Sequence, residues 1–339
     1  MKNKKRLNLK WNVIILTIIT VLIVVLTIKD DFFDIVNVLS KVNIFWIVIA
    51  IFLVLICWLL KASTITLFSK NFNKKYSFKS AMIMTLSTQF FNAITPFSSG
   101  GQPFQVYALS KNKIKTNQAI SVVAVSFICY QIALVLIGII SILINNVFHM
   151  FDKITLLQKL VTIGFSINVF VIALTLVLVF SKKINKKVAK ILINLLNKIN
   201  IVKNKDEAIE KVNDKLLEFY NSGKVLLNNK KDFVIGIFYN FISIICLYMI
   251  PIIIIFSIGN YKSLNIISSI VCSSYTMMIG SFVPLPGGIG GIEYGFINFF
   301  GQYLNGPILK VLMLLWRFFT YYFGMFLGIL TLNFMKRRK

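Results

Sequence analysis

The stretch Phe282-Val-Pro-Leu-Pro-Gly-Gly-Ile-Gly-Gly-Ile-Glu-Tyr294 places two prolines, four glycines and a carboxylate inside otherwise apolar sequence. Proline removes a backbone donor and glycine adds chain entropy, so this stretch predicts a broken helix whose freed polar groups need partners that lipid cannot provide. A second interruption, Thr95-Pro-Phe-Ser-Ser-Gly-Gly-Gln-Pro-Phe104, has the same order of proline, paired glycines and a polar residue. Two broken segments in corresponding halves of a membrane chain point to a transporter-type site.

Composition supports a membrane location for the rest of the chain. Of its 339 residues 57% are hydrophobic and 14% are charged, and the mean hydropathy is +0.80. These values are typical of a polytopic membrane protein and exclude a water-soluble globular domain. The net charge is +26, but the basic residues lie in short runs between apolar segments, which indicates membrane topology and no direct binding of nucleic acid.

Residue types that hold metals or perform acid–base chemistry are scarce. The four cysteines fall inside apolar segments without paired spacing, and His149 is the one histidine of the chain. We therefore expect the cysteines to be small core residues, and we expect no metal, no cofactor and no catalytic residue.

Hydropathy and segment length predict an all-α polytopic fold with about six full spans. The predicted spans are 11–28, 42–60, 119–144, 157–180, 233–258 and 308–334. The basic residues at their ends place the N- and C-termini in the cytoplasm of a bacterial-type plasma membrane. The chain is interpreted as one transmembrane domain, 1–339. Its first half is 1–180 with a break at 95–104, a basic cytoplasmic linker covers 181–232, and the second half is 233–339 with a break at 282–294.

Each break separates two apolar segments, at least one of which is too short to cross the membrane as a helix. Residues 81–94 and 104–109 flank the first break, and lysines precede and follow the unit, so a re-entrant hairpin is expected. The second unit joins 264–283 to 296–304 and fits either a re-entrant hairpin or two complete crossings, giving up to eight membrane segments. An inverted-repeat arrangement of the two halves is expected.

The polar linker carries apolar residues at helical spacing among its lysines. This pattern favours a basic amphipathic helix on the anionic inner leaflet, and a solvated linker between helices is the alternative. The apolar residues are Ile184, Val188, Ile191, Leu195 and Ile199.

Two ionisable residues lie within predicted membrane segments, which makes them functional candidates because such groups are costly in lipid. Arg317 is nine residues into the last span, about 13 Å deep at helical rise, and Glu293 follows the second break. Three readings stay open: a structural Glu293–Arg317 pair, an Arg317 that binds phosphate beside free amides at Gly287–Gly291, or a pair that opens to admit a charged headgroup.

The paired glycines predict either close helix packing or a site lining, and the adjacent prolines favour the lining. Polar and aromatic residues near both breaks complete the candidate set. The candidate lipid- and anion-binding residues are Pro96, Gly100, Gly101, Gln102, Pro103, Tyr107, Pro284, Pro286, Gly287, Gly288, Gly290, Gly291, Glu293, Trp316, Arg317 and Tyr321.

These motifs resemble a known family. The sequences Pro96-Phe-Ser-Ser-Gly-Gly-Gln-Pro-Phe-Gln-Val-Tyr-Ala-Leu109 and Pro284-Leu-Pro-Gly-Gly-Ile-Gly-Gly-Ile-Glu293, followed by Trp316-Arg317 and Tyr321-Tyr322, are similar to the lysylphosphatidylglycerol synthase transmembrane, flippase-like family. The resemblance implies a membrane module that moves aminoacylated phosphatidylglycerol between leaflets. In full-length relatives a soluble C-terminal domain performs the aminoacyl transfer, and the activity is linked to resistance against cationic antimicrobial peptides.

The chain departs from that pattern in two places. Many members carry glutamate where Gln102 stands, and the longest polar segment, 181–232, is too short for an acyl-transfer domain of about 100 residues or more. We therefore expect a lipid translocase for anionic or aminoacylated phospholipid, and no enzyme. One alternative is a membrane subunit of phosphatidylglycerol lysyltransferase with catalysis from another protein, and a second is a scaffold or transporter in envelope glycolipid synthesis. The expected partners are membrane phospholipids, a separate aminoacyltransferase or glycosyltransferase, and further copies of the chain.

Overall fold

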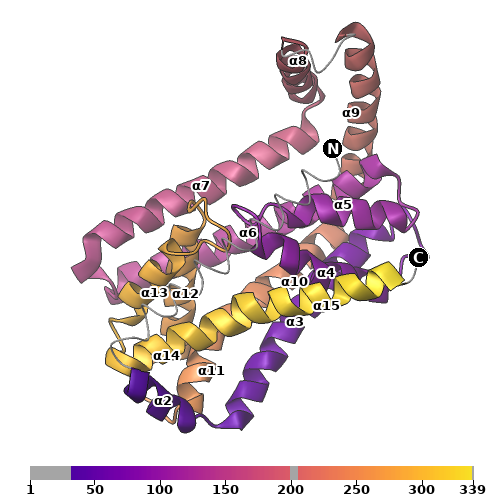
Figure 1. Ribbon diagram of the computed structural model, residues 1–339. Helices are drawn as coiled ribbons and strands as arrows, with labels where there is room; N and C mark the ends of the chain where they lie inside the picture. Colours follow the sequence, from indigo (N-terminus) through magenta and orange to yellow (C-terminus); the bar gives the residue numbers. More distant parts are fainter. Residues whose placement is uncertain (1–31, 199–204, 338–339) are drawn as a thin grey trace.

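The computed structural model describes residues 32–198 and 205–337, and every regular element in these ranges is helical (Figure 1). The predicted first span, 11–28, lies outside the described residues. The helices are α2 (Phe32–Ser40), α3 (Ile44–Ser69), α4 (Phe78–Ala93), α5 (Gly101–Lys111), α6 (Thr116–Phe148), η1 (Asp152–Ile154), α7 (Thr155–Phe180), α8 (Lys182–Lys198), α9 (Lys205–Asn228), α10 (Lys230–Tyr248), α11 (Ile250–Ser257), α12 (Ile266–Gly280), α13 (Gly291–Phe300), α14 (Gly306–Arg317), η2 (Phe318–Tyr322) and α15 (Phe323–Arg337).

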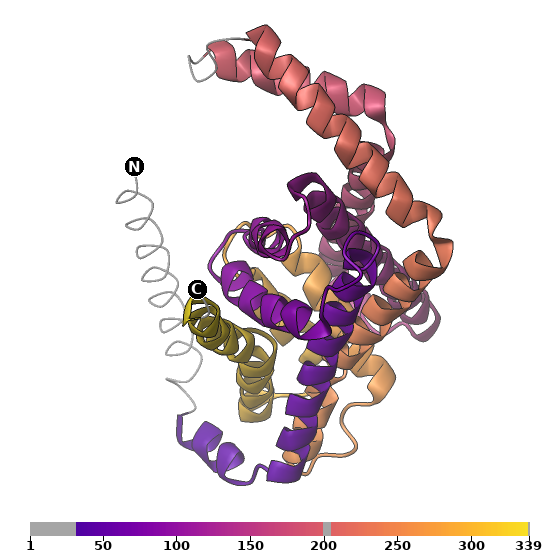
Figure 2. The same ribbon diagram turned by 90° about the vertical axis from the view of Figure 1, so that its right-hand side faces the viewer.

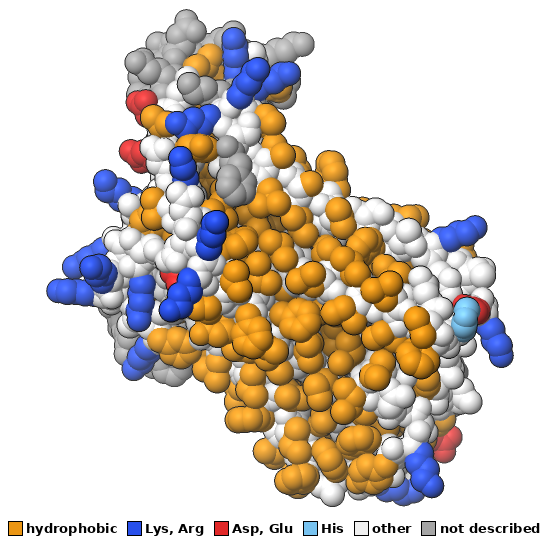
Figure 3. Space-filling view, turned by 180° about the vertical axis from the view of Figure 1, so that it is seen from behind, with side chains coloured by type: hydrophobic (Ala, Val, Ile, Leu, Met, Phe, Trp, Pro, Cys, Tyr) orange, Lys and Arg blue, Asp and Glu red, His pale blue; other side chains and the backbone are white. Residues whose placement is uncertain are grey.

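Five helical segments of the described chain are long and apolar enough to cross a membrane. They are Ile44–Ser69, Thr116–Phe148, Asp152–Val177, Lys230–Ser257 and Gly306–Asn333. Each one coincides with a span predicted from hydropathy. Figure 3 shows a broad apolar surface with basic side chains gathered towards its edges, as expected of a chain that crosses a membrane several times.

Helix α3 extends beyond the end of the span predicted at 42–60. Hydropathy falls at Lys61, but α3 continues to Ser69 because Ile65 and Phe68 are buried against neighbouring helices. Lys61 therefore lies eight residues inside the helix, about 12 Å from its C-terminal end at helical rise. Lys61, which directly follows the predicted span 42–60, is thus part of helix α3 and not of the loop that follows it.

The span predicted at 233–258 is interrupted where α10 gives way to α11 at Met249, just before Pro251. Proline lacks an amide hydrogen and breaks the regular helical pattern. Two hydroxyls of α12 satisfy a carbonyl at this point, because Ser269 Oγ and Ser273 Oγ both donate to Tyr248 O, at 2.8 Å and 3.3 Å. The interruption thus joins α10 to the buried helix α12.

The two breaks organise the fold as helix–break–helix units. The first break unit is α4 and α5, and both of its outer ends lie together because Asn73 Nδ2 donates to Asn112 O at 3.1 Å. These ends adjoin lysine-rich loops, and we call that side of the molecule the lysine-rich end. The second break unit is α12 and α13, whose chain enters from the opposite end, where Asn43 N donates to Ser257 O at 2.7 Å.

The two units meet at their tips. Pro96 and Pro286 form an isolated antiparallel bridge, so the two breaks that the sequence singled out lie directly against each other. The units thus point at one another from opposite ends of the molecule. This is the spatial relation expected of inverted-topology repeats.

The linker predicted at 181–232 forms two helices, α8 and α9, which project as an arm beyond the other helices (Figure 2). The arm is held at its base by Ser121 Oγ of α6, which donates to Phe219 O at 3.0 Å, and the ammonium of Lys182 lies 4.6 Å from the Tyr220 ring centroid. Ile184 and Ile191 of α8 are exposed. The helix expected over the first part of the linker is present, and α9 was not anticipated.

Candidate functional site

Arg317 and Glu293 form a buried ion pair at the centre of the molecule. Arg317 Nε donates to Glu293 Oε1 at 2.6 Å, and Nη2 lies 2.6 Å from the same oxygen. Arg317 Nη1 donates to the carbonyl of Gly287 at 3.2 Å, which ties the guanidinium to the second break. Only 6% of Arg317 and 8% of Glu293 is exposed, so the pair is desolvated and neither charge is stable there without the other.

Glu293 has a second role at the start of α13. Its Oε2 accepts the amide hydrogen of Gly290 at 2.6 Å, as the third-position glutamate of a helix start commonly does. The carboxylate also lies at the positive end of the α13 dipole. Each oxygen of Glu293 is therefore used by a different element, one by α13 and the other by Arg317 at the end of α14.

A π-helical turn, η2, follows Arg317 directly and sets the direction of the next aromatic residues. Such turns insert one residue into a helix and occur often at functional sites. Tyr321 in this turn donates its hydroxyl to Ala93 O at 2.8 Å, at the end of α4. The guanidinium carbon of Arg317 lies 5.6 Å from the ring centroids of both Trp316 and Tyr321, within the range of cation–π contacts.

Gly287 has the conformation and the space that only glycine fits. Its φ is +64°, and a Cβ placed on it would lie 2.3 Å from the Tyr321 ring. The second break, the π turn and the end of α4 therefore converge on one point beside Arg317.

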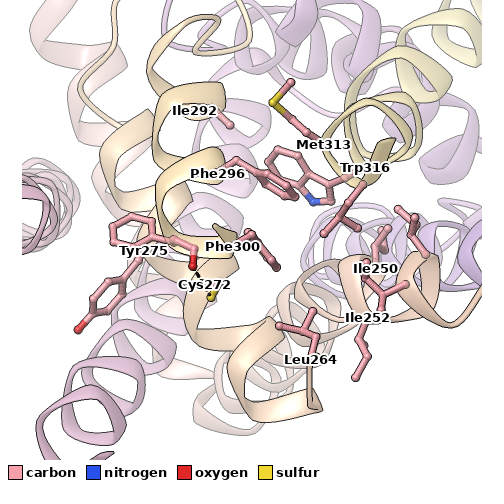
Figure 4. Packing of buried hydrophobic residues seen from close by; sticks show 14 of the residues in the cluster. Ile250, Ile252, Leu264, Cys272, Tyr275, Ile292, Phe296, Phe300, Met313 and Trp316 are labelled. Carbon is pink, nitrogen blue, oxygen red and sulfur yellow. Dashed lines mark hydrogen bonds between the residues drawn. The ribbon is translucent and has the colours of Figure 1, made fainter. Parts of the chain in front are cut away.

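Aromatic residues pack on one side of the Arg317–Glu293 pair, and exposed residues of the second break lie on the other side. Trp316 stacks on Phe296 at 4.6 Å between ring centroids, and Phe296 stacks on Phe300 at 4.2 Å (Figure 4). On the other side Pro284 and Gly290 are exposed, and an added Cβ at Gly290 would meet no atom within 4 Å. Buried Glu293 is thus hydrogen-bonded directly to Gly290, an exposed residue of the break.

The first break contributes to the site through its tip and not through its polar residues. Pro96 contacts the second break, whereas Gln102, Pro103 and Tyr107 are exposed on α5, and no described contact joins them to the ion pair. Lys111 lies over the Tyr107 ring at 5.7 Å.

Most of the paired glycines are explained by close packing. A Cβ at Gly101 would approach Asn92 Oδ1 to 2.1 Å, and one at Gly291 would approach Val283 Cγ2 to 2.3 Å. Gly100 and Gly288 are similarly crowded. The packing interpretation therefore holds at these positions, together with any role in lining the site.

The expectation of free amides across Gly287–Gly291 was wrong for the middle of this run. The amides of Gly288 and Ile289 donate to Leu285 O and Pro286 O, at 2.9 Å and 3.4 Å, and that of Gly290 donates to Glu293. The break satisfies its own backbone locally, as a segment away from water must. The amides of Gly288, Ile289 and Gly290 are therefore not free to bind an anion.

Comparison with known proteins gives a family. Residues 12–328 match the family described as "Lysylphosphatidylglycerol synthase TM region". The chain belongs to this family. It is also 23% identical over 310 residues to a "UPF0104 membrane protein" of Archaeoglobus fulgidus, with 88% of this chain and 89% of that protein covered. The resemblance drawn from the two break motifs is thereby confirmed, and both breaks lie inside the region that matches the lysylphosphatidylglycerol synthase TM family.

Sequence reasoning missed two contributors to this site of the family member, and it also missed the position of Lys61 inside a helix. The π turn and the Tyr321–Ala93 hydrogen bond left no signal, because neither changes hydropathy or local composition. The position of Lys61 within α3 did leave a signal, because the segment that follows it, Ala62-Ser-Thr-Ile-Thr-Leu-Phe-Ser69, contains no proline, glycine or charge.

Proposed function

We propose that this protein is a lipid translocase module for anionic or aminoacylated phospholipid, such as lysylphosphatidylglycerol, in a plasma membrane with both chain termini in the cytoplasm. The observation that carries the proposal is the buried Arg317–Glu293 pair at the meeting point of two opposed break units. Broken helices that meet near mid-membrane are the usual architecture of transporter sites. The name of the family to which the chain belongs supports the choice of lipid.

The chemistry of the pair matches that of an aminoacylated headgroup. A phosphodiester carries a negative charge that can replace Glu293 on the guanidinium, which binds phosphate in a bidentate manner. Glu293 Oε1, once released, would accept a hydrogen bond from an ammonium group of the lysyl moiety. Opening the pair in this way leaves neither buried charge without a partner, which keeps the energetic cost of the exchange low.

Glu293 can make this exchange without disturbing the helix it caps. Its Oε2 stays on the amide of Gly290 while Oε1 changes partner, so the start of α13 remains held. The exposed position of Gly290 gives a headgroup a route to the pair from the break.

The test is translocation of labelled lysylphosphatidylglycerol in proteoliposomes by wild type and by the double variant Glu293→Gln/Arg317→Gln. Single changes leave one buried charge alone and are expected to cost roughly 3–5 kcal/mol of stability, whereas the double variant avoids that penalty. We expect the double variant to fold and to lose transport by about tenfold or more, as removal of one charged contact predicts.

Rates are normalised to folded protein by thermal melting in detergent, and Lys262→Gln in an exposed loop serves as the charge-removal control. If the double variant transports lipid at the wild-type rate, the role of the pair is purely structural and the proposed site is rejected. The alternative role, a membrane subunit of lysylphosphatidylglycerol synthesis, predicts no lipid movement by the wild-type protein alone in the same assay.

A further inference from the structure

Lys61 is a second cation inside the membrane-spanning bundle, away from the Arg317–Glu293 pair. It lies on α3, and its ammonium faces the ring of Tyr130 on α6. Among the described residues no hydrogen bond or ion pair reaches its ammonium group, and its recorded contact is the Tyr130 ring, 5.6 Å from Nζ to the centroid. An ammonium at such a position is costly unless an anion or water meets it.

The depth of Lys61 follows independently from two helices. Tyr130 is 14 residues after the start of α6 at Thr116, which places the ring about 21 Å along the helix from the lysine-rich end. The side chain of Lys61 leans towards the N-terminus of α3, as helical side chains do, and so points away from that end. The ammonium of Lys61 therefore lies about two helical turns or more from the end of a helix that is long enough to cross a hydrocarbon core about 30 Å thick.

The polar side chains near Lys61 on α3 form hydrogen bonds with groups other than Lys61. Cys57 Sγ donates to Ser243 O at 3.1 Å, one turn before Lys61, and Thr64 Oγ1 donates to Leu60 O at 3.1 Å, one turn after it. Thr64 Oγ1 also accepts from Asn240 Nδ2 at 3.3 Å. The seam between α3 and α10 is thus polar and satisfied, while the three donors of Lys61 have no acceptor in it.

We propose that Lys61, whose ammonium lies over the ring of Tyr130, is the cation of an anion-binding site within the bundle, whose ligand is a phosphate group. An ammonium has three donors and a full charge, so its best partner is an acceptor-rich anion, and in a membrane the headgroup phosphates of lipids are the most abundant anions of this kind. Lys61 is only partly buried, so its surroundings are not sealed against a ligand.

The site adjoins the region of the first site without sharing its residues. Trp58, one turn before Lys61, stacks on Phe323 at 5.6 Å between ring centroids, and Phe323 begins α15 directly after the π turn. Binding of an anion at Lys61 does not depend on lipid translocation. It would stand even if Arg317 proved to be purely structural.

Binding of phosphatidylglycerol to purified protein in detergent, measured by native mass spectrometry, tests the site. Lys61→Met is expected to weaken the tightest binding step about tenfold, and Lys61→Arg, which keeps the charge, by no more than about threefold. The matched control is Lys70→Met, which removes an exposed lysine at the end of the same helix and should change binding less than about twofold.

Two further arms separate the sources of phosphate and the two sites. Stabilisation of wild type by inorganic phosphate, absent in Lys61→Met, would identify a site open to free anions, and an effect of phosphatidylglycerol alone would identify a lipid site. The dependence on Lys61 should persist in the Glu293→Gln/Arg317→Gln background, which distinguishes this site from the one proposed for transport.

A measurement on the unaltered protein keeps the test independent of folding. Phosphatidylglycerol should slow the reaction of Lys61 with an amine-specific reagent by about tenfold, while Lys70 on the same helix is affected little. Equal labelling of Lys61 with and without both phosphate sources, or unchanged binding in Lys61→Met, would overturn the proposal.

Discussion

At the scale of single residues, Glu293 is the group on which the site depends most. One oxygen holds the start of α13 through Gly290 and the other holds Arg317, so the carboxylate joins the second break to the last helix. The sequence predicted this pair as one of three readings, because an intramembrane Arg and Glu rarely occur without partners. It could not predict the amide of Gly290, since that contact depends on the turn geometry of the break.

Gly287 gives a prediction about backbone conformation and packing together. Gly287→Ala must place a side chain at φ +64° and against the Tyr321 ring, 2.3 Å from the new Cβ. Gly306→Ala meets the first difficulty alone, because Gly306 has φ +57° and no atom within 4 Å of the added Cβ. We expect about 1–2 kcal/mol of destabilisation at Gly306 and at least about 1 kcal/mol more at Gly287, measured by thermal melting in detergent.

The contribution of the ring can be checked in the same experiment. Tyr321→Leu combined with Gly287→Ala should recover the steric part of the loss, although it sacrifices the hydrogen bond to Ala93 O. Equal destabilisation by Gly287→Ala and Gly306→Ala would contradict the close packing of Tyr321 on the break.

At the scale of helices, the sequence predicted which membrane-spanning helices exist more easily than it predicted where each one ends. The spans seen in α3, α6, α7, α10–α11 and α14–α15 all followed from runs of apolar residues. The end of α3 did not, because Lys61 interrupts the apolar run while the buried residues Ile65 and Phe68 continue the helix in the fold. The span 233–258 was predicted without an interruption, although Pro251 carried a signal for one, whereas the π turn after Arg317 depends on packing and has no local signature.

The contact between the two breaks leads to a prediction about movement. A headgroup that passes between the units requires their tips to separate, and Pro96 and Pro286 are paired there. In a background without the four native cysteines, Pro96→Cys combined with Pro286→Cys should form a disulfide, because paired positions of an antiparallel bridge have Cα separations within disulfide range. The cross-linked protein should transport lipid at background rate and recover on reduction.

The two single-cysteine variants, oxidised in the same way, control for the loss of each proline. They should form no intramolecular disulfide and should keep their transport rate through oxidation and reduction. Undiminished transport by fully cross-linked protein would mean that the tips need not part.

At the scale of the whole molecule, the lysine-rich loops lie at one end of the helix bundle and the apolar surface lies along its length. The lysine-rich loops adjoin the outer ends of the first break unit, and the second unit enters from the opposite end. The surface is broadly apolar, with basic side chains towards its edges (Figure 3). The opposed units could be expected from the repeated order of prolines and glycines in the two halves. Their tip-to-tip contact could not, because it depends on how the two halves pack, which no local pattern records.

This arrangement predicts which positions face which side of the membrane. Lysine bias favours the cytoplasm for the lysine-rich end, so single cysteines at Lys75, Lys113 and Lys224 should react with a membrane-impermeant reagent only after the cell is opened. Cysteines at Asp152 and Asn260 should react in intact cells. The decisive comparison is Lys75 with Lys113, since they flank the first break unit and the hydrogen bond from Asn73 to Asn112 holds its two ends together. Labelling of these two positions from opposite sides would make the first unit a full crossing and remove the opposed pair of re-entrant units on which the site is built.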